Sequence, residues 1–202
     1  MIYEPLYIFD DELRAEYGPL LCGCDEAGRG PLAGPVSCAA VILKPEERFE
    51  WLNDSKKVSE KRRERLFAEI TERALYYKIV FIDNKTIDEI NILRASLEGM
   101  KRAALSLGVA PSYIAFDGGL APECGDIPCG CVVRGDARSA SIAAASVLAK
   151  VARDRFMREL DEKYPQYGFA KHKGYPTKEH YAAIAKHGIS EYHRRTFLKG
   201  RI

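Results

Sequence analysis

Residues 20–43 read LLCGCDEAGRGPLAGPVSCAAVIL, and this stretch sets the architecture of the sheet. Residues 20–26 are a short apolar run bounded by turn residues, which is typical of a strand, and residues 36–43 form a second such run. The segment between them, GRGPLAGP, is a rigid turn short enough to join antiparallel neighbours. The sequence therefore predicts an antiparallel strand pair here.

After this pair the pattern alternates between helices and strands. Periodicity and capping residues predict helices over residues 59–74, 86–107, 139–163 and 177–187, and strands over residues 75–83, 113–116 and 131–134. Residues 1–18 read as a loosely packed lead-in. The helix over residues 139–163 begins with SASIAAAS, whose small side chains allow a close approach to a sheet. We predict an α/β fold with a mixed β-sheet flanked by helices and a helical C-terminal part.

Length and composition limit the class of protein. The 202 residues carry 31 Lys and Arg against 29 Asp and Glu, a net charge of +2, and suit one domain that folds without staples. We expect a core over residues 20–163 and a C-terminal segment with a basic rim over residues 164–202. The longest uncharged apolar runs fall short of the ~20 residues of a membrane helix, and no secretory signal is apparent. We expect a cytoplasmic monomer without membrane association.

Six cysteines allow two interpretations. They lie at positions 22, 24, 38, 124, 129 and 131. Zinc sites usually show C-x₂₋₄-C pairs, whereas both close pairs here are C-x-C. A disulfide framework is typical of secreted chains. We therefore favour buried or half-buried free thiols over a zinc site.

Charge is distributed unevenly along the chain. Residues 1–50 hold 4 basic and 10 acidic side chains, whereas residues 171–202 hold 8 basic and 2 acidic ones together with all four histidines. This distribution fits an acidic floor and a basic rim of one site, or simply two solvated faces. The histidines lack metal-ligand spacing, and we expect them to be structural.

Four carboxylates lie at or just after strand ends: Asp25, Glu26, Asp117 and Asp136. Sites of α/β sheets are assembled there. Converging carboxylates repel one another, and a divalent cation relieves that repulsion. Neighbours on an ideal strand face opposite ways, so Asp25 and Glu26 share a site only if the chain twists, which Gly28 permits. The alternative is that these carboxylates serve turns and caps.

The glycine-rich turn and several basic residues are the other candidates. Residues 28–33 fit the dinucleotide fingerprint G-x-G-x-x-G/A, but that motif must open a helix and a strand-like run follows here. Bare backbone at Gly28, Arg29 and Gly30 can instead approach a ribose hydroxyl or phosphate. Lys150 lies in the small-residue helix, where a buried ammonium needs a carboxylate or phosphate partner. The remaining candidates for a nucleic-acid surface are Lys56, Arg153, Lys171, Lys173 and Tyr175.

Taken together, these segments resemble the ribonuclease HII family. The resemblance rests on CDEAGRGPLAGPV at residues 24–36, DSKK at 54–57, FDG at 116–118, GDA at 135–137, IAAASVLAKVARD at 142–154, YPQYG at 164–168 and HKGY at 172–175. It runs from about residue 20 to 198 in the order of the family. The sister ribonuclease HIII fits less well, because its motif lacks the GRG sequence.

The resemblance implies a ribonuclease H-like fold and cleavage of RNA in RNA–DNA hybrids, with incision at single ribonucleotides in duplex DNA. It implies metal binding, by Mg²⁺ or Mn²⁺ in a two-ion site, at Asp25, Glu26, Asp117 and Asp136. It also implies that Gly28–Arg29–Gly30 reads the RNA–DNA junction and that Tyr175 packs near the junction sugar. Pro176 stands where the family commonly has glycine. The competing class is a nucleic-acid-binding module whose carboxylates are structural.

Overall fold

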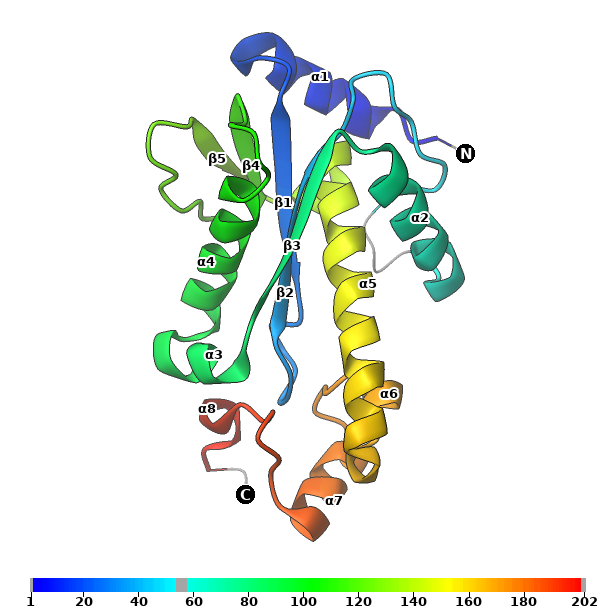
Figure 1. The fold of residues 1–202 in the computed structure, drawn as a ribbon, viewed down its shortest axis with the longest axis vertical. Helices are drawn as coiled ribbons and strands as arrows, with labels where there is room; N and C mark the ends of the chain where they lie inside the picture. Colours follow the sequence, from blue (N-terminus) through cyan, green and yellow to red (C-terminus); the bar gives the residue numbers. More distant parts are fainter. Residues whose placement is uncertain (1, 54–57, 201–202) are drawn as a thin grey trace.

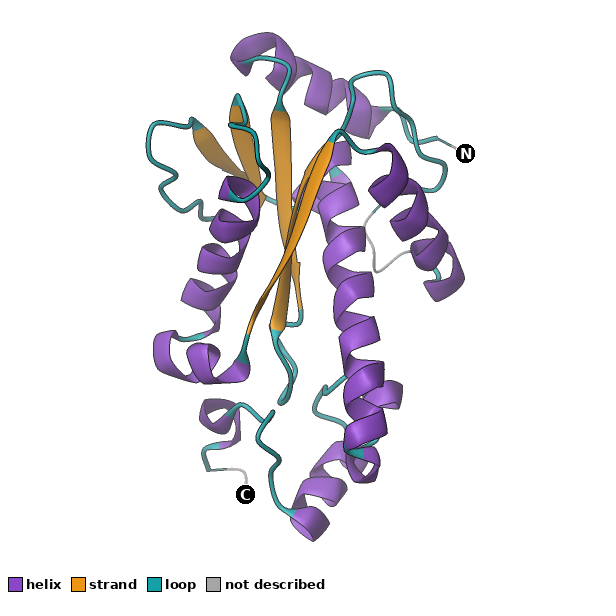
Figure 2. Ribbon diagram, viewed as in Figure 1, coloured by secondary structure: helices purple, strands orange, loops and turns teal. Residues whose placement is uncertain are grey.

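The computed structural model describes residues 2–53 and 58–200 (Figure 1). Its helices and strands are, in chain order, α1 (Pro5–Tyr17), β1 (Leu21–Ala27), β2 (Val36–Ile42), α2 (Glu60–Arg73), β3 (Tyr76–Ile82), α3 (Asn84–Ile90), α4 (Ile92–Leu105), β4 (Tyr113–Asp117), β5 (Cys129–Val132), the 3₁₀ turn η1 (Gly135–Ala137), α5 (Ala140–Lys163), the 3₁₀ turn η2 (Pro165–Tyr167), α6 (Phe169–His172), α7 (Lys178–His187) and α8 (Arg195–Leu198). Figure 2 shows the sheet between two helical layers, with the short C-terminal helices gathered beyond one end of it.

The five strands form one mixed sheet in the order β3-β2-β1-β4-β5. Strand β1 pairs antiparallel with β2, with Cys24 opposite Ala40, and parallel with β4, with Cys24 opposite Phe116. Strand β5 continues the parallel half beside β4. The predicted antiparallel pair and mixed sheet are confirmed. Because β1, β4 and β5 are parallel, their carboxyl ends meet at one edge of the sheet.

Helix α5 lies directly on β1, as its small residues predicted. A Cβ added at Gly23 would lie 2.3 Å from the backbone nitrogen of Ile142, so nothing larger than glycine fits under this helix. The alanines of the first half of α5 are fully buried. Helices α3 and α4 cover the opposite face, where a Cβ at Gly99 would lie 2.5 Å from Cys38 Sγ (Figure 1). The sheet is therefore sandwiched at close range.

Three expectations about elements were wrong. The helix expected over residues 86–107 is two helices, because Asn91 adopts φ 68°, outside helical geometry, and its side chain accepts from Arg94 N. The strand expected over residues 131–134 covers Cys129–Val132 instead, since residues 129–132 complete the register with β4. The lead-in of residues 1–18 contains α1, which packs across the sheet end near the start of α5 (Figure 1).

Helix α1 is fixed by one buried carboxylate. Asp10, fully buried, accepts hydrogen bonds from Ser139 Oγ at 2.5 Å, Ser141 N at 2.8 Å and Ser141 Oγ at 2.7 Å. These groups belong to the first turn of α5, whose free N–H groups attract a negative charge. Burial raises the pKa of Asp10 even though the serines oppose the shift. The N-terminal segment is thus tied to the chain that follows η1.

The cysteine side chains mostly match the predicted buried or half-buried free thiols. All six cysteines are free, four of them buried and Cys129 half-buried, while Cys131 is exposed contrary to expectation. No group of three histidine, cysteine or acidic side chains lies in ligating geometry within residues 2–53 and 58–200. Within the same ranges, no helix combines the length and apolar character needed to cross a bilayer.

Candidate active site

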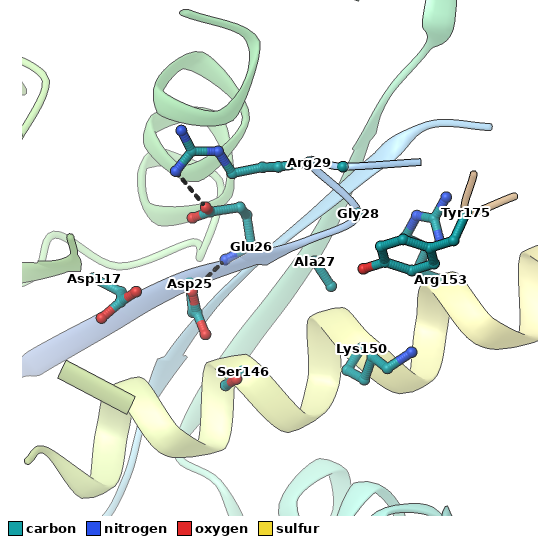
Figure 3. Close-up of a pocket in the computed structure, with 11 residues that line it drawn as sticks. Asp25, Glu26, Ala27, Gly28, Arg29, Asp117, Ser146, Lys150, Arg153 and Tyr175 are labelled. Carbon is teal, nitrogen blue, oxygen red and sulfur yellow. Dashed lines mark hydrogen bonds and ion pairs between the residues drawn. The ribbon is translucent and has the colours of Figure 1, made fainter. Parts of the chain in front are cut away.

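A pocket of about 390 Å³ opens at the sheet edge where β1 and β4 end (Figure 3). It is enclosed by strand ends on one side, by α5 beneath and by the glycine-rich turn and the segment after α6 on the other side. The lining residues are Asp25, Glu26, Ala27, Gly28, Arg29, Gly30, Asp117, Ser146, Lys150, Arg153 and Tyr175. Nine of the thirteen residues predicted for the site therefore line one pocket.

Three of the four predicted carboxylates form the acidic wall of this pocket. Asp25 and Glu26 come from the end of β1, and Asp117 is the last residue of the parallel neighbour β4. Asp25 is only 5% exposed and accepts a hydrogen bond of 2.7 Å from the backbone nitrogen of Glu26. Burial first, then the charges of Glu26 and Asp117, hold the pKa of Asp25 well above its usual range. The wall therefore disfavours its own negative charge.

The fourth carboxylate, Asp136, lies beside this wall without lining the pocket. It belongs to η1, just past the end of β5, and is 8% exposed. The preceding residue, Gly135, donates its backbone N–H to Asp117 Oδ1 at 2.6 Å. A Cβ at Gly135 would lie 2.6 Å from Ile142 Cδ1, so glycine lets η1 pack against α5. Asp136 thus follows directly on a residue that contacts the acidic wall.

The acidic wall has the donor chemistry of a hard divalent cation. Carboxylate oxygens are the protein ligands that Mg²⁺ and Mn²⁺ prefer, and Mg²⁺ keeps several waters in its shell. Glu26 pairs with Arg29, yet burial and the charges of Glu26 and Asp117 still raise the pKa of Asp25, so further positive charge would stabilise the wall. A divalent cation would supply that charge, so these residues fit the metal expected from the sequence.

The glycine-rich turn forms the wall that faces the carboxylates. Gly28 has φ 100°, a backbone conformation that favours glycine. A Cβ there would also lie 2.0 Å from Arg153 Nε, so a side chain would clash. Arg29 turns back toward the acidic wall, with its Nη1 3.3 Å from Glu26 Oε1 (Figure 3). A Cβ on Gly30 would lie 3.5 Å from the Tyr175 ring. The turn thus presents bare backbone next to an aromatic side chain.

Tyr175 projects into the pocket from the segment after α6 and is 42% exposed. Its backbone is held by buried histidines. Gly174 N donates to His172 Nδ1 at 3.2 Å, and His180 Nδ1 donates to the Tyr175 carbonyl at 2.9 Å. Leu32 N donates to the Gly174 carbonyl at 2.8 Å, which joins this segment to the glycine-rich turn. The two segments that carry Gly30 and Tyr175 are therefore joined and form one wall of the pocket.

His172, His180 and His193 lie in a row: the rings of His172 and His180 are stacked, and Nε2 of His180 faces Nε2 of His193. The hydrogen-bond partners of the rings fix their tautomers. His193 Nδ1 accepts from Ser190 N at 2.9 Å, so its Nε2 carries the proton toward His180 Nε2, 3.1 Å away. Protonating either ring would set two N–H groups against each other. Burial, followed by the charge of His180, lowers the pKa of His193 to about 4. These histidines are structural, as expected.

The basic candidates separate into several groups. Lys150 lines the pocket and pairs with Asp154 at 2.6 Å, which confirms the expected carboxylate partner. Lys171 is exposed and pairs with Glu179 at 3.2 Å. Lys173 is half-buried and contacts the Ala170 carbonyl. Neither Lys171 nor Lys173 lines the pocket. Lys56 lies outside the described residues.

Arg153 lines the pocket, but its guanidinium is 1% exposed and every donor nitrogen contacts a backbone carbonyl. The sequence suggested Arg153 as a candidate for a nucleic-acid surface, but its donors are already engaged with the backbone. Sequence reasoning missed Arg194 entirely, although it holds the glycine-rich turn from below. It also missed Asp10 and Ser146. Nothing in the sequence indicates that Arg194, one of several basic residues near the C-terminus, is buried. Asp10 could have been found by predicting a helix over residues 5–17.

The class of protein follows from the sheet order, the strand-end carboxylates and the helix on β1. Together they are typical of a hydrolase with a ribonuclease H-type fold. A ribonuclease H2 structure from Pyrococcus horikoshii OT3 superposes with a TM-score of 0.73 at 27% identity, covering 87% of this chain and 92% of that one. The family model for ribonuclease HII matches residues 22–200.

Curated relatives agree with that match. Ribonuclease HII of Acinetobacter baylyi is 53% identical over 182 residues, 90% of this chain and 96% of the relative. Ribonuclease HII of a Marinomonas species is 54% identical over 186 residues, 91% of this chain and 92% of the relative. The chain belongs to the ribonuclease HII family, an enzyme family of endoribonucleases acting on RNA–DNA hybrids. Membership favours an enzyme over a binding module with structural carboxylates.

Proposed function

We propose that the chain incises duplex DNA on the 5′ side of a single embedded ribonucleotide, besides cleaving the RNA strand of hybrids, and leaves 3′-hydroxyl and 5′-phosphate ends. The observation that carries the proposal is the pocket itself. Its acidic wall, formed by Asp25, Glu26 and Asp117, faces a wall of bare glycine backbone and Tyr175 (Figure 3). One wall suits a phosphate bridged by cations, and the other suits a ribose.

The carboxylates of Asp25, Glu26, Asp117 and Asp136 would hold Mg²⁺ or Mn²⁺ in a two-ion site. When bound, two such ions supply charge stabilisation for the attacking water, the phosphate and the departing 3′ oxygen. The parallel strands β1 and β4 hold Asp25 and Asp117 at adjacent strand ends, and the Gly135 contact brings η1 beside them. Asp136 follows directly on Gly135, which supports its inclusion in the set.

Ribose recognition falls to the opposite wall. The 2′-hydroxyl is both a donor and an acceptor, and it is what distinguishes RNA from DNA at a given sugar. Gly28, Arg29 and Gly30 offer backbone groups without an intervening Cβ at two of the three positions. The Tyr175 ring lies next to Gly30 and would pack against the adjoining sugar. An all-DNA duplex offers this wall no hydroxyl.

Basic residues would bind the phosphates that flank the cut. Lys150 lies on the α5 floor of the pocket, and its pair with Asp154 leaves further donor positions on the ammonium. Lys171 and Lys173 belong to the proposed basic rim and would bind phosphates farther along the duplex, and Lys56 stays a candidate phosphate contact from the sequence alone. Arg153 acts through the turn that it holds, since its donors are engaged with carbonyls.

The test is cleavage of three end-labelled duplexes of one sequence: all DNA, DNA with one ribonucleotide, and a continuous RNA–DNA hybrid. With Mg²⁺ or Mn²⁺ we expect the last two to be cut, the single-ribonucleotide duplex at its 5′ side, and EDTA to abolish both cuts. Ligation of the 5′-phosphate end and extension of the 3′-hydroxyl end identify the products. Cleavage that persists in EDTA, or a single-ribonucleotide duplex left intact while the hybrid is cut, would refute the proposal.

A further inference from the structure

Two buried arginines lie beneath the glycine-rich turn. Arg153 is 1% exposed and Arg194 is fully buried. Arg194 donates to the carbonyls of Gly28 at 2.7 Å, Arg29 at 2.9 Å and Gly34 at 3.0 Å. Arg153 donates to Ala33, Pro35 and Lys173 at 3.0 to 3.1 Å. Between them they hold both ends of the turn.

Burying a guanidinium costs much free energy unless its donors are satisfied. Here the partners are carbonyl dipoles, and the two positive charges repel each other. Burial first, then the charge of Arg153, lowers the pKa of Arg194 to about 9. An apolar side chain would fill the same volume without this cost. What the guanidinium adds is a planar set of donors that fixes the direction of three carbonyls at once.

We propose that Arg194 is a positioning residue that sets the preference of the enzyme for the ribonucleotide at an RNA–DNA junction. A trans peptide unit directs its carbonyl and the following N–H to opposite sides. Because Arg194 draws the Gly28 and Arg29 carbonyls toward the core, the N–H groups of Arg29 and Gly30 point away from it. Those N–H groups belong to the stretch that lines the pocket. This inference rests on the proposed function and names a residue that serves it.

The segment that carries Arg194 is itself built into the turn. Arg194 N donates to the Leu32 carbonyl at 2.8 Å, and Gly34 N donates to the Tyr192 carbonyl at 2.9 Å. Ala33 and His193 form an isolated antiparallel bridge. Since Arg153 also holds the Lys173 carbonyl, two residues before Tyr175, the turn and the tyrosine are held by one buried frame.

This frame matters most where recognition is sparse. A duplex with one ribonucleotide presents a single 2′-hydroxyl, so displaced N–H groups lose the only contact that marks the cut. A continuous hybrid offers a 2′-hydroxyl at each register, and a displaced turn still meets one. Loosening the turn should therefore reduce cleavage of the single-ribonucleotide duplex more than cleavage of the hybrid.

The experiment compares Arg194→Lys and Arg194→Met with a matched control, Arg195→Lys, on both substrates. Lysine keeps the charge but cannot reach three carbonyls in one plane, whereas methionine keeps only the volume. Arg195 is exposed and follows directly in the chain. We expect kcat/KM on the single-ribonucleotide duplex to fall at least about tenfold further than on the hybrid in the Arg194 variants, the effect of one to two weakened charged hydrogen bonds. The control should change the ratio less than about twofold.

The outcomes separate this inference from the function on which it rests. If the wild-type chain leaves the single-ribonucleotide duplex intact, the proposed function fails. If the wild type cuts both substrates and folded Arg194→Lys keeps their kcat/KM ratio, the positioning role is wrong. Should neither Arg194 variant fold, Asn84→Ala provides the test, because Asn84 Nδ2 holds the carbonyls of Glu191 and His193 at 2.9 and 3.1 Å. An unchanged ratio in folded Asn84→Ala would then overturn the proposal.

Discussion

Replacing Asp10 by alanine should destabilise the protein by about 4 kcal/mol, since removing one partner of a buried charged network typically costs about 3–5 kcal/mol. The substitution strands three buried donors at once, namely Ser139 Oγ, Ser141 N and Ser141 Oγ. Each stranded donor costs about 1–3 kcal/mol, partly recovered because hydroxyls rotate and Ser139 Oγ also accepts from Ile142 N. Asp10→Asn should cost less, because an amide oxygen still accepts and the buried charge, which raises the pKa of Asp10, is gone.

Thermal and urea unfolding at pH 7 measure both variants. For a chain of this length about 1 kcal/mol corresponds to roughly 2–4 °C in Tm, so Asp10→Ala should melt roughly 8–16 °C below the wild type. Asp11→Ala is the matched control: its carboxylate is half exposed and pairs with Arg14 at 2.8 Å, so about 0.5 kcal/mol or less is expected. If Asp10→Ala melts within 3 °C of this control, roughly the shift of 1 kcal/mol, the proposed anchoring of α1 to α5 is refuted.

Two further predictions concern the site, and a third concerns the buried His193. Asp136→Asn should abolish cleavage while Tm and hybrid affinity stay near wild type, and wild-type turnover would remove Asp136 from the metal set. Tyr175→Ala should lose more activity than Tyr175→Phe, mostly on the single-ribonucleotide duplex; equal activity of both with wild type would assign sugar packing to another residue. The pKa of His193 lies near 4 when folded, below its unfolded value of about 6.5, so its contribution to stability is present above pH 6.5 and is lost as pH falls toward 4. Urea unfolding across this range should show a shallower decline in His193→Asn, and an identical decline would contradict that account.

Much of the sheet could be predicted because its signals are local. The turn GRGPLAGP separates two apolar runs of strand length, and the small residues of SASIAAAS predict the close contact of α5 with β1. The wrong prediction of a single helix over residues 86–107 has a local cause too. Asn91 breaks the helix expected over residues 86–107 with a left-handed φ, and a periodicity that continues on both sides of one residue conceals such a break.

The acidic wall could be predicted from the topology of the sheet. The buried residues Arg194 and Asp10, which hold the backbone near the site, could not. Asp25, Glu26 and Asp117 each end a strand, and parallel strands place such residues at one edge. Arg194 and Asp10 act through contacts with residues more than a hundred positions away in the chain. No spacing rule links such pairs, so the charge count only grouped Arg194 with the basic side chains of residues 171–202 and Asp10 with the acidic side chains of residues 1–50.

Overlooking Arg194 and overlooking Asp10 have the same physical cause, which is the burial of a charged side chain. A charged side chain at a chain end is read as solvated because burial costs several kcal/mol per ion. For Asp10, Arg153 and Arg194 that cost is offset by several hydrogen bonds to groups gathered in one place. The first turn of α5 offers donors to Asp10, and the glycine-rich turn offers carbonyls to Arg153 and Arg194. Both places adjoin predicted site residues: the first turn of α5 follows Asp136, and the turn itself contains Gly28–Arg29–Gly30. Asp10, Arg153 and Arg194 therefore lie where backbone next to the site is held in one conformation, so removing Asp10 should lower stability and removing Arg194 should change substrate selectivity.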